Sequence, residues 1–141
     1  MTWTLHVGDC MDVLSTLAPG SVAMVATAPP YGLAGQGKLS VRGVGDTWEA
    51  TGVDLERDKE FPTDWIEPAA AAMRPGASGF CFLDTKRVTD LWRALKAAGL
   101  RPFDVFQWIK PNWPANPRKG FASAVESAVV FAKPGPGRVW N

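Results

Sequence analysis

An apolar run that ends in a rigid, aromatic turn contains the residues best suited to chemistry in this chain. The run covers residues 21–27 and is followed by Ala28-Pro29-Pro30-Tyr31. Proline fixes φ and donates no hydrogen bond, so the two prolines stop a buried strand at the end where ligands collect in open α/β sheets. The turn offers a backbone carbonyl as an acceptor and the Tyr31 ring as a stacking face, which suits an extruded nucleobase. A plain strand-terminating turn is the other interpretation.

The elements that would position this turn alternate between strand and helix. The patterns predict helices over residues 11–17, 63–73 and 85–98, and strands over residues 4–7, 22–27, 79–83, 103–109 and 124–131. The continuous apolar run at 22–27 is typical of a parallel strand buried on both faces. Residues 32–60 are Gly-rich and then acidic, with no period, and are predicted to form a loop or lid. The alternation predicts a single α/β domain over residues 1–141 with a largely parallel sheet.

Length and composition exclude several classes of protein. At 141 residues the chain is expected to form one domain with a real core, and no signal peptide or membrane-length apolar stretch is visible. We therefore expect a cytoplasmic protein with no membrane partner. Cys10 and Cys81 fall in elements predicted to be buried or half-buried, which favours core thiols over a disulfide. The single histidine, His6, has no metal-binding cluster around it and is interpreted as an ordinary strand residue, so no metal is expected.

Charge is unevenly distributed along the chain although the net charge is only +1. Residues 46–67 carry eight acids against Arg57 and Lys59, a local charge of −6. Residues 68–141 carry eleven basic and four acidic side chains, a local charge of +7. The basic second half could face phosphates, which predicts weak to moderate, salt-dependent DNA binding. An ordinary solvated surface explains the same charges equally well.

Ordered blocks over almost the whole chain resemble the amino-group DNA methyltransferases, which use S-adenosylmethionine to methylate adenine-N6 or cytosine-N4. The family signature is Asp, Asn or Ser followed by Pro-Pro-Tyr, and Ala28 stands at its first position here. Similar blocks occur at residues 7–22, 73–76, 79–82, 108–112, 118–121 and 126–133. Their order is the circularly permuted one, in which the catalytic block precedes the main cofactor block.

The resemblance implies a fold and a set of roles. The fold would be a Rossmann-like methyltransferase sheet ending in an antiparallel strand pair, with the family's central cofactor-binding strands absent from these 141 residues. Asp9, Cys10 and Thr27 would contact S-adenosylmethionine, although Asp9 equally suits a helix cap. The Pro29 carbonyl would accept from the target amino group, beside Pro30 and the Tyr31 ring. The residues implied in DNA contact are Trp113, Arg118, Lys119 and Phe121, with Lys38 and Arg42 as weaker candidates and a packed loop with solvated charges as the alternative.

Three departures from the family pattern predict an inactive or impaired catalyst. Ala28 offers no side-chain acceptor, and Ala23 stands within a strand where the family commonly has Asp. No glycine-rich cofactor loop follows a strand, since Gly35-Gln36-Gly37 lies in the loop after Tyr31. The sequence thus predicts a methyltransferase-like protein of the restriction-modification and base-flipping kind.

Three alternatives remain open. The chain could be half of a split or truncated enzyme that needs a second chain, a catalytically dead module that binds DNA or protein, or a remnant that self-associates. In the family's order the strand at 4–7 lies beyond the absent strands, which leaves the strand at 22–27 with an open apolar edge. This edge predicts either a homo-oligomer or a complementary methyltransferase chain.

Overall fold

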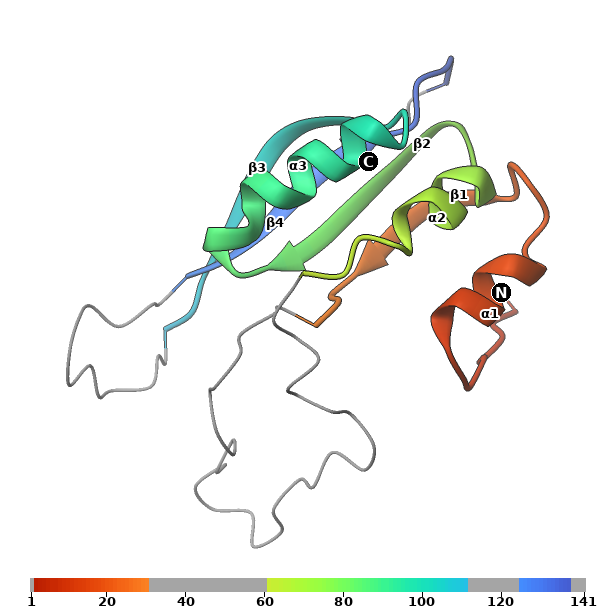
Figure 1. The fold of residues 1–141 in the computed structure, drawn as a ribbon, viewed down its shortest axis with the longest axis horizontal. Helices are drawn as coiled ribbons and strands as arrows, with labels where there is room; N and C mark the ends of the chain where they lie inside the picture. The colour runs from red at the N-terminus through yellow and green to blue at the C-terminus, as the bar shows by residue number, and fades with distance from the viewer. Residues whose placement is uncertain (1, 31–60, 112–124, 138–141) are drawn as a thin grey trace, which may run out of the picture.

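A computed structural model describes residues 2–30, 61–111 and 125–137 (Figure 1). The described elements, in chain order, are α1 (Cys10–Thr16), β1 (Val22–Thr27), α2 (Ile66–Ala72), β2 (Met73–Leu83), the short 3-10 helix η2 (Thr85–Arg87), α3 (Val88–Ala97), β3 (Arg101–Ile109) and β4 (Val125–Ala132). The predicted strand 22–27 is confirmed with the same bounds, and the predicted helices are confirmed with shifted ends. The strand predicted at 79–83 begins earlier, at Met73, and includes Pro75 and Gly76.

The strands form one mixed sheet in the order β1-β2-β4-β3. β1 runs parallel to β2, while β4 pairs antiparallel with both β2 and β3. The predicted α/β class with a C-terminal antiparallel pair is confirmed. β1, β2 and β3 therefore run in one direction and β4 runs in the opposite direction. The carboxyl ends of β1, β2 and β3 and the start of β4 all lie at the same end of the sheet.

The helices α2 and α3 pack on the same face of the sheet, and the hydrophobic core lies between them and the strands (Figure 1). On α3, Leu91 and Leu95 are fully buried, and Val88 and Trp92 pack against the same cluster, so these four residues form an apolar stripe along the helix. Gly99 ends the helix with a φ of 75°, and the Leu100 amide donates back to the Leu95 carbonyl. This left-handed turn is a common helix terminus because glycine adopts it without strain.

The other helices are held by specific caps. The carboxylate of Asp9 accepts from the Met11 amide at 2.8 Å, so its predicted role as an N-cap of α1 is confirmed. At the carboxyl end of α2, the Lys133 ammonium donates to the carbonyls of Ala70 and Met73 at 2.7 and 2.8 Å. The late start of α2 at Ile66 places Pro68 in the first turn, where a missing amide costs little.

Four expectations about the N-terminal third are wrong. Residues 4–7 form no strand, because no other described strand pairs with them, and His6 is therefore not a strand residue. β1 is not buried on both faces, because the Met24 side chain on one face is 60% exposed. It also lies at the edge of the described sheet, where it pairs only with β2. Cys10 is exposed on α1, whereas Cys81 is buried as expected; both are free thiols.

The second face of the sheet is not covered by any helix in the described ranges. Strand register places the Met24, Phe82, Phe106 and Trp108 side chains on this face, opposite the face that α2 and α3 cover. Phe106 is 53% exposed and Trp108 is 50% exposed. Within the described residues, no helix is long and apolar enough to cross a membrane.

Candidate functional site

A cavity of about 1090 Å³ opens between α1, β1 and α2, and it extends past the carboxyl end of β1 to Pro30 and past the amino end of α2 to Pro62. Its volume is slightly above the usual range of ligand pockets, about 300–1,000 Å³. The parallel β1–α2–β2 connection explains its position, because the helix after a strand begins near the edge at which that strand ends. The cavity therefore lies where α/β sheets usually bind ligands.

The cavity brings together residues that the sequence assigned to two separate roles. Its walls include the candidate cofactor residues Asp9, Cys10 and Thr27. They also include the first three residues of the candidate catalytic turn, at positions 28–30. In sequence, Asp9 and Cys10 lie at the start of α1, whereas the turn follows the end of β1. The packing of α1 against α2, beside β1 in the sheet, brings them to one cavity.

The Asp9 carboxylate is fixed in orientation and keeps one oxygen available. Its Oδ1 accepts from the Met11 amide, which anchors the side chain at the start of α1. In the described part of the chain, no hydrogen bond to its second oxygen is present. A carboxylate held in this way can accept from a ligand hydroxyl or amine without first becoming ordered.

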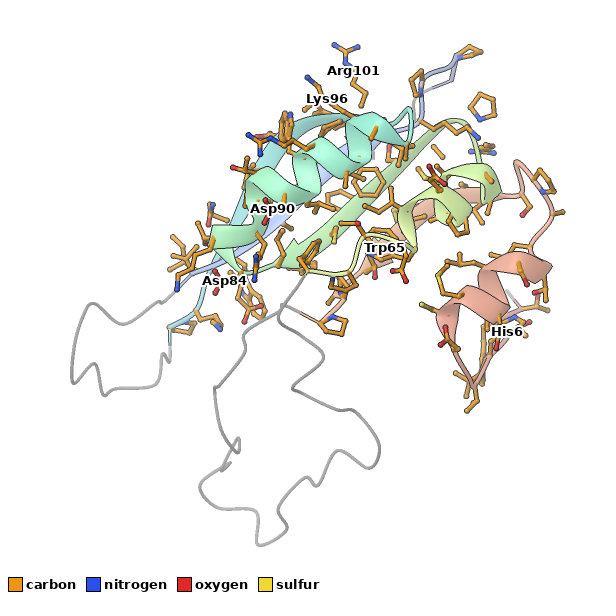
Figure 2. All side chains as sticks on the ribbon, viewed as in Figure 1. His6, Trp65, Asp84, Asp90, Lys96 and Arg101 are labelled. Carbon is orange, nitrogen blue, oxygen red and sulfur yellow. The ribbon has the colours of Figure 1, made fainter. Side chains whose placement is uncertain are left out.

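Sequence reasoning missed the wall contributed by the start of α2, and also His6. Pro62, Asp64 and Trp65 line the cavity, and Trp65 is buried at the amino end of α2 (Figure 2). Its indole nitrogen donates to the Pro62 carbonyl at 3.1 Å, and its amide donates to Asp64 Oδ1 at 3.1 Å. These bonds order the approach to α2. The βαβ pattern itself was a usable signal, because it places the start of the helix beside the end of β1.

A second group of polar side chains lies at the same edge of the sheet, on β3, β4 and η2. The fully buried Ser127 hydroxyl donates to Gln107 Oε1 at 3.2 Å and lies 2.9 Å from the Thr85 hydroxyl. Nearby in sequence, the Lys110 ammonium pairs with Glu126 at 2.5 Å. The sequence predicted neither the hydroxyl cluster nor the Lys110–Glu126 ion pair, because the residues in each come from separate segments of the chain.

The remaining predicted site residues lie outside the described residues. They are Tyr31, Lys38, Arg42, Trp113, Arg118, Lys119 and Phe121. Their stacking and DNA-contact roles stay predictions. Among the residues that the structure describes, no three His, Cys, Asp or Glu side chains gather into a possible metal site.

The two thiols differ sharply in their environments. Cys81 is fully buried in the core cluster, and this burial raises the pKa of its thiol to about 12. Cys10 is exposed and lines the cavity. Since the thiolate is the reactive form of cysteine, Cys81 is inert in the folded protein and Cys10 can report on the occupancy of the cavity.

Comparison with solved structures identifies the fold. PvuII DNA methyltransferase, which is cytosine-N4-specific, superposes with a TM-score of 0.60 at 16% identity. TTHA0409, a DNA modification methylase from Thermus thermophilus, gives 0.62 at 21% identity, and the M1.HpyAVI complex with S-adenosylmethionine gives 0.62 at 19%. No protein-family model matches the sequence, and neither does any curated protein.

These matches cover nearly all of this chain but only part of the others. They span 92% of this chain and 49% of PvuII, 96% and 56% for TTHA0409, and 92% and 54% for M1.HpyAVI. The chain thus spans about half the length of these solved structures. At such low identity the likeness defines a fold: the described residues have the fold of these DNA methyltransferases.

Proposed function

We propose that the cavity is the site of an S-adenosylmethionine-dependent DNA amino-methyltransferase, for adenine-N6 or cytosine-N4, impaired in this chain by Ala28. One observation carries the proposal: the candidate cofactor residues and the candidate catalytic turn line one cavity at the carboxyl end of β1. The methyltransferase fold supports it, since TTHA0409 also has a structure in complex with S-adenosylmethionine.

The chemistry explains the role of each residue in the turn. An exocyclic amino group is a poor nucleophile, because its lone pair is delocalised into the ring of the base. Two acceptors that bind its hydrogens localise the lone pair and hold the nitrogen in line with a methyl donor. The Pro29 carbonyl can be one acceptor, and an extruded base could stack on Tyr31. The second acceptor is missing, because Ala28 has only a methyl side chain.

The residues present fit the methyl donor. The cavity is large enough, and the free oxygen of Asp9 is suited to accept from the hydroxyls of an adenosine group, with Cys10 and Thr27 on the adjoining walls. When bound, S-adenosylmethionine supplies an electrophilic methyl group. Asp9 and the strand end would orient it toward the turn at residues 28–30.

The proposed partner is DNA, bound with a strong dependence on salt through the basic second half of the chain. In this proposal residues 1–141 act as one methyltransferase-like domain in the cytoplasm, within a base-flipping modification system. A second candidate function, one half of a split methyltransferase, is favoured by the match to only about half of each solved structure. A catalytically dead DNA- or protein-binding module has no comparable observation in its favour.

Calorimetric titration with S-adenosylmethionine tests the cofactor part of the proposal. We expect saturable binding that Asp9→Asn weakens by about 10–100-fold, because hydrogen bonds to charged groups contribute about 1.5–3 kcal/mol. Asparagine caps a helix as well as aspartate, so α1 should remain folded. The matched control is Asp12→Asn, which removes the same charge from an exposed residue of α1 outside the cavity. Equal affinities for the two variants would contradict the proposed role of Asp9.

A further inference from the structure

We propose that the cavity selects ligands of net positive charge, and that Asp64 sets this selectivity together with Asp9. The selectivity rests on the proposed function for the identity of its ligand, and it names the charge state that the site favours. S-adenosylmethionine carries one more positive charge than its demethylated product, S-adenosylhomocysteine. The cavity should therefore bind the methyl donor more tightly than the product.

The charge of the cavity wall is the first observation. Among the described residues that line the cavity, Asp9 and Asp64 are the acidic ones, and His6 is the only one that can carry a positive charge. A charged His6 would still leave this wall net negative. Most of the other lining residues are apolar, such as Leu14 and Val25. A large, mostly apolar cavity with an excess of carboxylates suits an organic cation, because a cleft lined by one sign of charge concentrates ligands of the opposite sign.

The position of the Asp64 carboxylate is the second observation. The Trp65 amide donates to Asp64 Oδ1 at 3.1 Å, and the Trp65 indole nitrogen donates to the Pro62 carbonyl at 3.1 Å. Trp65 is only 7% exposed, so these bonds tie the carboxylate to a buried side chain. Within the described ranges no hydrogen bond reaches the second oxygen of Asp64. The carboxylate is thus held in the wall of the cavity with one oxygen available to a ligand.

Asp9 and Asp64 reach the cavity from separate segments of the chain. Asp9 directly precedes α1 and Asp64 lies just before α2, and each has one oxygen bonded to a backbone amide. A sphere of the cavity's volume is about 13 Å across, which is shorter than the Debye length of about 30 Å at 0.01 M salt. At low salt both carboxylates therefore act on a ligand anywhere in the cavity, and added salt weakens their attraction.

This selectivity has a consequence for turnover. Transfer of the methyl group to an amine removes the sulfonium charge from the donor, and the positive charge passes to the amine, which then loses a proton to solvent. The product keeps one ammonium and one carboxylate, so that its net charge is zero. The two carboxylates of the wall would hold this neutral product more weakly, which favours its release. They would also repel phosphate, so that an extruded nucleotide would enter with its base alone.

The Cys10 thiol can measure the charge of the cavity without any methyl donor, because it is exposed and lines the cavity. The experiment compares its rate of reaction with a cationic reagent, trimethylammonioethyl methanethiosulfonate, and with an anionic one, sulfonatoethyl methanethiosulfonate. At about 0.01 M salt we expect the ratio of the two rates to exceed that of a free thiol at least tenfold. Salt at about 1 M, where the Debye length is about 3 Å, should bring the ratio close to that of the free thiol.

Asp64→Asn should lower this ratio of rates at least threefold at low salt. Asparagine keeps an oxygen that can accept from the Trp65 amide, so the wall should stay folded. The matched control is Glu67→Gln, which removes the same charge from an exposed residue of α2 that does not line this cavity. It should leave the ratio unchanged.

Calorimetric titration then compares the donor with the product. We expect S-adenosylmethionine to bind at least fivefold more tightly than S-adenosylhomocysteine, and Asp64→Asn to reduce this preference, whereas Glu67→Gln should preserve it. A ratio of labelling rates equal to that of a free thiol, a ratio insensitive to salt, or equal effects of the two variants would overturn the proposal. Equal affinities for donor and product would also overturn it. If neither compound binds, the proposed function fails, and the labelling ratio alone then decides whether the cavity selects cations.

Discussion

Replacing Ala28 with aspartate is expected to raise methyl transfer to unmethylated DNA by about 10²–10³-fold, the usual effect of one polar contact to a transition state. Ala28 is exposed and lines the cavity, so a carboxylate there has room and does not disturb the core. It would restore the missing acceptor opposite the Pro29 carbonyl. The measurement is incorporation of radiolabelled methyl groups, in which the unmodified chain should not exceed background.

Ala71→Asp is the matched control for this prediction. It adds the same carboxylate to an exposed residue of α2 that does not line the cavity, and it should leave incorporation at background. Turnover by the unmodified chain at the rate of an ordinary enzyme would show that the site works without an acceptor at residue 28. If the cofactor is bound and Ala28→Asp has no effect, the turn is not the catalytic site.

The largest effect on stability is expected from Gly79→Ala. Gly79 pairs with Phe131 across β2 and β4, and a Cβ on Gly79 would overlap the Phe131 ring. Phe131 is fully buried in the core cluster with Leu91 and Leu95, so its ring has little room to move. Overpacking of this kind typically costs about 1–3 kcal/mol and occasionally more. Chemical denaturation should show the loss as a lower midpoint.

A double variant distinguishes this overlap from a general effect of alanine in the strand. Phe131→Leu alone should also destabilise the protein, because it leaves space in the core. Combined with Gly79→Ala, it should cost less than the sum of the two single changes, since the smaller side chain removes the overlap. Strictly additive losses would show that the ring and the new methyl group do not compete for space.

Local sequence signals were sufficient for much of the fold. The alternation of strand and helix predicted the helices, although with shifted ends, and the Pro-Pro pair predicted the end of β1. The strand predicted at residues 4–7 failed for a physical reason. Alternating apolar residues show that a segment can pair, but pairing also needs a neighbour. None of the described strands lies beside Trp3, Leu5 and Val7.

The residues that line the cavity were predictable only where they adjoin the end of a helix or strand. Asp9 directly precedes α1, and the turn at residues 28–30 directly follows β1; both line the cavity. Trp65 is buried, as is common for an aromatic residue, and it also forms part of the cavity wall. The contact between Ser127, Thr85 and Gln107 depends on strand order, which a single sequence leaves open.

The rate at which Cys10 reacts with N-ethylmaleimide tests the central claim most directly, because Cys10 lies in the wall of the proposed cofactor site. The folded protein should label at Cys10 alone, since Cys81 is fully buried and its thiol has a pKa of about 12. We predict that S-adenosylmethionine at about ten times its Kd slows labelling of Cys10 at least fivefold, and that Asp9→Asn clearly reduces this protection at the same concentration. A labelling rate that millimolar S-adenosylmethionine leaves unchanged would contradict the assignment of this cavity to the methyl donor.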